Sequence, residues 1–176
     1  MTRGSPPARP LARAGTFEVV VLRDGKESPR KCSLTPLRGR PEIRFLEWRP
    51  SVVLDAAGHT LLHVGGEPLT AADRGRPLLL LDASWKKVPR MLRSLRGDPA
   101  RRSIPRGWET AYPRRSKTFP DPPRGLASVE ALFAASAILG EPRFDLLEGY
   151  AFAEAFLRAN ARRLGAPVAP AEGSLQ

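Results

Sequence analysis

The sequence predicts an α/β fold with a mostly parallel sheet and at least three helices, and three observations indicate it. Residues 16–22 (T-F-E-V-V-V-L) are rich in β-branched side chains, as a buried strand is. Residues 78–82 (L-L-L-L-D) are apolar on both faces, which is typical of a central strand covered on both sides. Residues 126–139 are apolar nearly all round, as a core helix is. Strands come first and mixed units of strand and helix later, which favours this class.

The other elements follow from local patterns. Short strands are expected at residues 43–48, 51–54 and 60–64. Residues 86–95 have apolar side chains at helical spacing, with Pro89 tolerable only in the first turn. Residues 144–164 predict a second long helix, with acidic residues near its start and arginines near its end, as the helix dipole favours. Residues 96–124 are dense in Pro, Arg and Gly and are expected to form a binding loop.

The chain is expected to form one domain with loose ends. Residues 16–164 would be the single α/β domain, between a disordered basic tail at 1–15 and a disordered tail at 165–176, since both ends hold little apolar material. No apolar run approaches the roughly 20 residues that span a bilayer. No apolar region follows the first arginines, so no signal peptide is expected. These features predict a cytoplasmic protein without a membrane partner.

The composition points to a polyanionic partner. Lys plus Arg number 29 against 18 for Asp plus Glu, which gives a formal net charge of +11. The lone cysteine, Cys32, excludes a disulfide scaffold, and no metal site is expected because the only histidines are His59 and His63. These three residues are interpreted as structural or surface residues.

The positive charge is concentrated in residues 86–124, which carry 12 basic and 3 acidic groups. Trp108, Tyr112 and Phe119 alternate there with arginines, so that phosphate-seeking charges lie beside rings on which an unstacked base could stack. The alternative is a solvated charged face in an arginine-rich composition. The predicted RNA-binding residues are Lys86, Lys87, Arg90, Arg101, Arg102, Arg106, Arg114, Arg115 and Lys117.

The strongest candidate for a site is D-A-S-W, residues 82–85, at the end of the predicted central strand. Ligands of open α/β sheets bind at the carboxyl ends of strands. The alternative is that Asp82 caps the following helix and that Trp85 belongs to the core. None of the common nucleotide-binding or hydrolase motifs occurs.

Several motifs carry a resemblance to a known family. D-A-S-W-K-K-V-P, R-S-I-P, Y-P-R-R-S-K and L-A-S-V-E-A-L-F-A-A, in this order, look like the aminocarboxypropyltransferases that modify small-subunit ribosomal RNA. S-P-R-K-C-S-L-T-P-L at 28–37 and P-L-T-A-A-D at 68–73 are similar to two upstream motifs of that family. The DTW-domain enzymes, which modify tRNA uridines, share the D-x-[ST]-W and L-[ST]-x-x-E-A pair. The resemblance covers roughly residues 16–160.

The resemblance implies a SPOUT-like fold with a C-terminal knot and S-adenosylmethionine as the cofactor. The implied reaction is transfer of its 3-amino-3-carboxypropyl group to N3 of a uridine or modified uridine in rRNA or tRNA, with release of methylthioadenosine. Asp82 would accept the cofactor's ammonium or help to remove the N3 proton, and Trp85 would wall the pocket or stack on the base, so both are the predicted catalytic residues. The predicted cofactor-binding residues are Leu54, Leu81, Asp82, Ser84, Trp85, Tyr112, Leu126 and Ser128.

The chain also departs from that family. Ala127 stands where the family has Ser or Thr, which removes a capping box with Glu130, and Ser128 is expected to cap the helix instead. T-A-Y-P-R-R-S-K replaces the ribosomal family's A-N-P-V-N-Y-G, so the choice between rRNA and tRNA stays open. Two other functions also stay open: a non-catalytic RNA-binding or ribosome-associated module, and an RNA methyltransferase on the same scaffold. The sequence does not fix the oligomeric state.

Overall fold

The structure is a computed structural model that describes residues 17–26, 32–113 and 125–165. Its strands are β1 (Val19–Asp24), β2 (Ile43–Trp48), β3 (Leu54–Asp55), β4 (Thr60–Pro68), β5 (Leu78–Asp82), β6 (Leu95–Arg96) and β7 (Ala100–Ser103). Its α-helices are α1 (Val88–Leu92), α2 (Ser128–Ile138) and α3 (Ala153–Ala159). Short 3-10 helices are η2 (Thr35–Leu37), η3 (Ala71–Asp73), η4 (Phe144–Leu147) and η5 (Ala161–Leu164). The predicted tail at 1–15, and that at 165–176 except for Gly165, lie outside the described residues.

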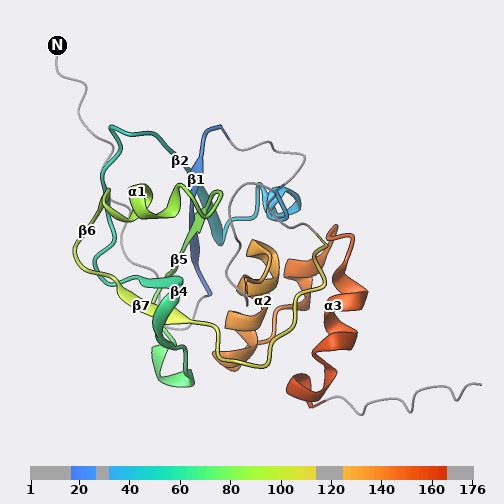
Figure 1. The fold of residues 1–176 in the computed structure, drawn as a ribbon. Coiled ribbons are helices and arrows are strands. Elements are labelled where there is room, and N and C mark those ends of the chain that lie inside the picture. The colour runs from blue at the N-terminus through green and yellow to red at the C-terminus, as the bar shows by residue number, and fades with distance from the viewer. Residues whose placement is uncertain (1–16, 27–31, 114–124, 166–176) are drawn as a thin grey trace, which may run out of the picture.

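Five strands form one sheet in the order β2-β1-β5-β4-β7, and each neighbouring pair is parallel. β3 and β6 form a second, two-stranded parallel sheet. Helices flank the larger sheet, with α1 on one side and α2 and α3 on the other (Figure 1). The predicted α/β class with a mostly parallel sheet is confirmed.

Side chains of the central strands alternate between two apolar clusters. Val19 and Val21 belong to the larger cluster, which includes α2 and α3 residues such as Phe133 and Phe156. Val20 and Leu22 belong to the smaller cluster, which contains Met91 of α1 and Trp48 of β2. All six residues of β1 are buried, as expected for a strand in the middle of a covered parallel sheet.

The topology places a switch point between β1 and β5. The chain leaves β1 towards β2 on one side and leaves β5 towards β7 on the other. Ligands of open α/β sheets bind outside the carboxyl ends of strands at such a point. The residues at these two ends are Arg23 and Asp24 on β1 and Asp82 on β5.

The predicted long helix over residues 144–164 is wrong. The structure contains η4, α3 and η5 there, separated by turns. Gly149 has a φ of +75°, which ends the first piece. Asn160 ends the second: its buried side chain donates to the backbone oxygens of Glu109 and Phe156. The charge pattern favours one continuous helix, but the Asn160 side chain instead forms hydrogen bonds to a distant segment, and the helix ends there.

The predicted binding loop at 96–124 is partly regular structure. Residues 100–103 form the edge strand β7, which pairs with β4. Gly66 of β4 lies so close to the backbone of Arg101 and Arg102 that a Cβ there would stand 2.6 Å from it. β4 is longer than predicted and its register shifts between Leu62 and Glu67. Conversely, the predicted strand at 51–54 is reduced to β3 and the helix at 86–95 to α1.

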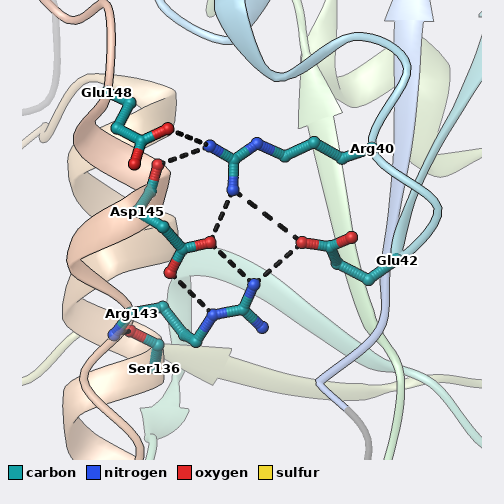
Figure 2. Close-up of polar contacts among 6 residues, drawn as sticks. All are labelled: Arg40, Glu42, Ser136, Arg143, Asp145 and Glu148. Carbon is teal, nitrogen blue, oxygen red and sulfur yellow. Dashed lines mark hydrogen bonds and ion pairs between the residues drawn. The ribbon is translucent and has the colours of Figure 1, made fainter.

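A network of ion pairs ties the segment before β2 to η4 (Figure 2). Arg40 contacts Asp145 at 2.5 Å and Glu148 at 3.1 Å. Arg143 contacts Glu42 at 2.8 Å and both carboxylate oxygens of Asp145 at 2.8 and 2.7 Å. Two guanidinium groups therefore share one carboxylate between two distant parts of the chain.

This network predicts an acid-sensitive contribution to stability. Hydrogen bonds from Arg143, and further ones from Arg40, lower the pKa of Asp145 to about 2, from an ordinary 3.8. The ionised carboxylate therefore stabilises the fold above its ordinary pKa, and the contribution is lost as the pH falls towards about 2. We expect Asp145→Asn to destabilise the protein at neutral pH by about 1 kcal/mol, because the partly exposed pair is screened. Urea unfolding over a pH series measures this loss.

The difference between Asp145→Asn and the unmodified protein should shrink as the pH falls from about 4 to about 2. Asp98→Asn is the matched control, because Asp98 is exposed and enters none of the ion pairs formed by the described residues. A loss on Asp145→Asn that stays constant across this range would contradict the assignment.

Candidate functional site

The carboxyl end of β5 holds a buried ion pair. Asp82 is the register partner of Arg23 on β1. Both side chains lie on the face of the sheet that α2 covers, because they continue the alternation of Val19, Val21, Leu78 and Leu80. Arg23 Nε lies 3.8 Å from Asp82 Oδ2, and the two side chains are only 6% and 11% exposed. The buried charge of each is thus compensated by the other.

Two further side chains orient the Asp82 carboxylate. The thiol of Cys32 donates to Oδ2 at 2.9 Å, and the hydroxyl of Ser128 donates to Oδ1 at 3.1 Å. Burial, followed by the charge and the hydrogen bond of Asp82, raises the pKa of Cys32 to about 11. The sulfur therefore stays a neutral thiol donor at neutral pH. Both carboxylate oxygens are fixed by groups from distant parts of the chain.

The amino-terminal end of α2 lies beside this carboxylate. Its first residue is Ser128, so the prediction that Ser128 caps the helix is wrong: Ala127 is the N-cap, and the Ser128 hydroxyl binds Asp82. Half of the capping box survives, because the Ala127 N–H donates to Glu130 Oε2 at 2.8 Å. The Val129 N–H donates to Ser33 Oγ at 3.2 Å. The positive end of an 11-residue helix thus faces the Asp82 edge.

Glu130 is a fully buried carboxylate that joins four groups. Oε2 accepts from the Thr110 hydroxyl at 2.6 Å and from the Ala127 N–H at 2.8 Å. Oε1 accepts from the Ala111 N–H and from the Tyr150 hydroxyl, both at 2.9 Å. Burial and the charge of Glu130 raise the pKa of Tyr150. One side chain therefore fixes the segment around residue 111 against the start of α2.

Tyr112 and Trp108 take part in aromatic clusters. The Tyr112 ring lies 6.4 Å from Tyr150 and 5.7 Å from Phe152. Trp108 lies 6.1 Å from Phe156 and packs on the larger cluster. Trp108 is half-buried and its ring packs against the core, so its expected role as a ring on which a base could stack stays a prediction. Phe119 lies outside the described residues.

The other predicted cofactor-binding residues are divided between the two faces. Leu54 and Leu81 pack against the smaller cluster, on the side opposite Asp82. Ser84 is exposed and accepts the Lys87 N–H at 2.8 Å in the turn before α1, where Trp85 is half-buried. Leu126 packs at the edge of the larger cluster, just before α2. The structure brings Asp82 and Ser128 into contact, and the remaining assignments stay predictions.

The predicted RNA-binding residues differ in their surroundings. Arg102 contacts Asp73 at 2.7 Å and Glu67 at 3.4 Å, so its charge is balanced within the fold. Lys87 pairs with the buried Asp24 on the α1 side of the sheet. The exposed members are Lys86, Arg90, Arg101 and Arg106. Arg114, Arg115 and Lys117 lie outside the described residues.

The histidines and the cysteine have separate surroundings. Burial and the charge of Arg101 lower the pKa of His63, while His59 Nδ1 lies 3.1 Å from the Ala57 carbonyl oxygen. Within residues 17–26, 32–113 and 125–165, no three His, Cys, Asp or Glu side chains are grouped as metal ligands. Cys32, expected to be structural or on the surface, donates a hydrogen bond to the predicted catalytic carboxylate.

Three residues near this site were not predicted as site residues from the sequence: Arg23, Cys32 and Glu130. Cys32 lies in the S-P-R-K-C-S-L-T-P-L motif and Glu130 in L-A-S-V-E-A-L-F-A-A. Their positions in these two motifs could have identified both as candidate site residues. The sequence signal for Arg23 is weaker. It is a charged residue that continues a buried strand, and a buried charge needs a partner.

A scan against protein-family models and a search of curated proteins find no match. Among solved structures, the chain is similar to the SAM-dependent rRNA:acp-transferase Tsr3 from Vulcanisaeta distributa, where SAM denotes S-adenosylmethionine and acp the aminocarboxypropyl group. The TM-score is 0.65 and the sequences are 25% identical, over 85% of this chain and 81% of that one. The resemblance carried by the motifs is thereby confirmed at the level of the structure.

Proposed function

We propose that this chain is an S-adenosylmethionine-dependent RNA aminocarboxypropyltransferase. It would transfer the 3-amino-3-carboxypropyl group to N3 of a uridine or modified uridine, with rRNA as the favoured acceptor and tRNA as the other. The observation that carries the proposal is the similarity to Tsr3, which covers most of both chains. The proposal includes a SPOUT-like topology with a C-terminal knot, and a cytoplasmic location stays a prediction. In the described residues, no helix is long and apolar enough to cross a membrane.

The chemistry of the Asp82 edge fits the cofactor's amino acid tail. That tail carries an ammonium and a carboxylate, which need an acceptor and donors. A carboxylate offers about four lone-pair positions, and Cys32 and Ser128 occupy two of those on Asp82. The amino-terminal end of α2 supplies the positive end of a helix dipole for a carboxylate. The acceptor and the positive end of the helix dipole therefore lie at one edge of the sheet.

S-adenosylmethionine supplies an activated sulfonium centre, so that attack by N3 on one carbon breaks a carbon–sulfur bond and releases methylthioadenosine. The protein then has mainly to orient groups. Asp82 would bind the ammonium or receive the N3 proton, and Arg23 would keep the carboxylate in place. Glu130 would hold the segment that ends in Tyr112 beside α2. Leu54, Leu81, Ser84, Trp85 and Leu126 are proposed to line the cofactor site.

The test is incubation of the purified chain with total RNA and S-adenosylmethionine labelled in the carboxypropyl carbons. We expect label in the RNA and an equal amount of methylthioadenosine. Methyl-labelled cofactor is the matched control, and label transferred from it would indicate a methyltransferase instead. Absence of transfer from both, with RNA still bound, would overturn the proposal in favour of a non-catalytic RNA-binding module. Separation of rRNA from tRNA before nucleoside mass spectrometry identifies the acceptor.

A further inference from the structure

Four exposed basic side chains follow Asp82 in the chain and lie on the α1 side of the molecule. They are Lys86, Arg90, Arg93 and Arg96, and we refer to them as the α1 basic face. Residues 86–98 carry five basic groups and one acidic group. α1 and β6 lie next to each other at one side of the sheet, away from α2 and α3 (Figure 1). Arg93 and Arg96 were not among the predicted RNA-binding residues.

The orientation of these side chains follows from what α1 buries. Val88 and Met91 are buried, and Met91, which is completely buried, belongs to the smaller cluster. The exposed Arg90 and Arg93 are on the opposite, outer side. The Arg90 guanidinium lies 5.7 Å from the centre of the Trp48 ring, and Arg90 as a whole is exposed. The packing of α1 therefore leaves the Arg90 and Arg93 side chains exposed to solvent.

The α1 basic face lacks internal compensation. None of the ion pairs formed within the described residues includes any of its four members, and Arg96 donates only to the backbone oxygens of Arg93 and Leu95. Lys87 and Arg102 differ, since both pair with carboxylates. Uncompensated like charges create a positive potential, which attracts a polyanion.

We propose that the α1 basic face binds the phosphate backbone of the RNA substrate next to the Asp82 edge. Lys86 lies in the turn between β5 and α1, which leaves the same carboxyl edge of the sheet, so RNA bound there would reach that edge from the face opposite the Asp82 side chain. Three of the four residues are arginines, whose guanidinium groups pair bidentately with phosphate. The identity of the RNA as a substrate rests on the proposed function, whereas binding itself is independent of it.

The test is salt-dependent binding of a labelled RNA stem-loop, with a uridine in its loop, in the absence of S-adenosylmethionine. R93Q/R96Q should lower the slope of log K against log salt by about 1.5 and weaken binding at about 0.1 M salt by on the order of tenfold or more. R158Q/R162Q is the matched control, because it removes the same charge from exposed positions on α3 and η5. Circular dichroism should show that both variants are folded.

An unchanged slope in R93Q/R96Q, or an equal loss in R158Q/R162Q, would overturn the inference. Binding of the same kind to vesicles with anionic lipid, but not to RNA, would also overturn it. The outcome is separable from that of the proposed function. If R93Q/R96Q loses RNA binding but still forms methylthioadenosine with a mononucleotide acceptor, the result supports this face as the RNA-binding site. If the unmodified protein binds RNA but transfers no group, the result contradicts the proposed reaction and leaves the RNA-binding face intact.

Discussion

Glu130→Gln is expected to destabilise the protein by about 3 kcal/mol, a large part of the total stability of a domain this size. Each oxygen of Glu130 accepts one backbone N–H and one hydroxyl. A glutamine has one oxygen, so in either orientation its NH₂ group faces a backbone N–H, which cannot turn away. The variant also loses the stronger hydrogen bonds that a charged acceptor makes. Urea unfolding, with the slope checked for two-state behaviour, measures the loss.

Glu154→Gln is the matched control for this substitution. Glu154 is exposed and pairs with Arg158 one helical turn away, so its loss should change stability by less than about 0.5 kcal/mol. Tyr150→Phe removes one donor from Glu130 and should give an intermediate loss of about 1.5 kcal/mol. A Glu130→Gln variant as stable as Glu154→Gln would show that the four hydrogen bonds do not hold this part of the fold.

Most strands of the sheet could be predicted from the sequence, but complete burial did not fix their bounds. Residues 43–48 and 78–82 were predicted with the bounds that the structure has, whereas the completely buried β1 was predicted at 16–22 and lies at 19–24, because Arg23 and Asp24 interrupt the apolar pattern. β7 (A-R-R-S) could not be predicted, since it has no apolar pattern and pairs only at the edge of the sheet. Its strand conformation depends on β4, a neighbour about 40 residues earlier in the chain.

The C-terminal region shows the limit of helical patterning. Residues 144–164 have the charge distribution of one helix, but Gly149 and Asn160 interrupt it. The Asn160 side chain binds both backbone groups of Glu109, a partner that no local pattern reveals. Tertiary hydrogen bonds therefore favour short helical pieces over one continuous helix, and α3 packs Phe156 against Trp108.

The position of the site could be predicted, but its composition could not. The end of a buried parallel strand, followed by a helix, pointed to Asp82 on physical grounds. Its partners come from β1, from the segment after residue 31 and from the start of α2, so only the fold reveals that Arg23, Cys32 and Ser128 meet there. The arginine count predicted a polyanion, but it did not separate compensated arginines such as Arg102 from exposed ones.

Asp82→Asn is expected to reduce RNA-dependent methylthioadenosine release by at least about 100-fold, the lower end of what a positioned acid or base contributes. Asparagine keeps the size of the side chain, but it removes the charge that faces Arg23 and would bind the ammonium. Calorimetry with S-adenosylmethionine distinguishes the two proposed roles. If Asp82 binds the ammonium, cofactor affinity falls together with transfer; if it receives the N3 proton, affinity persists and the pH dependence of transfer changes.

Asp24→Asn provides a control that is matched in burial and position. Asp24 is 4% exposed at the end of the neighbouring strand, but it lies on the other face and pairs with Lys87. Each variant removes the charge of a buried carboxylate that forms an ion pair, so a fall in stability is expected in both, the larger one in Asp82→Asn because Arg23 is buried while Lys87 is partly exposed. Only Asp82→Asn should lose transfer at a temperature where both are folded. Equal transfer by the two variants would show that the Asp82 carboxylate only stabilises the fold. Its contribution to activity would then be the same as that of the Asp24 carboxylate on the other face.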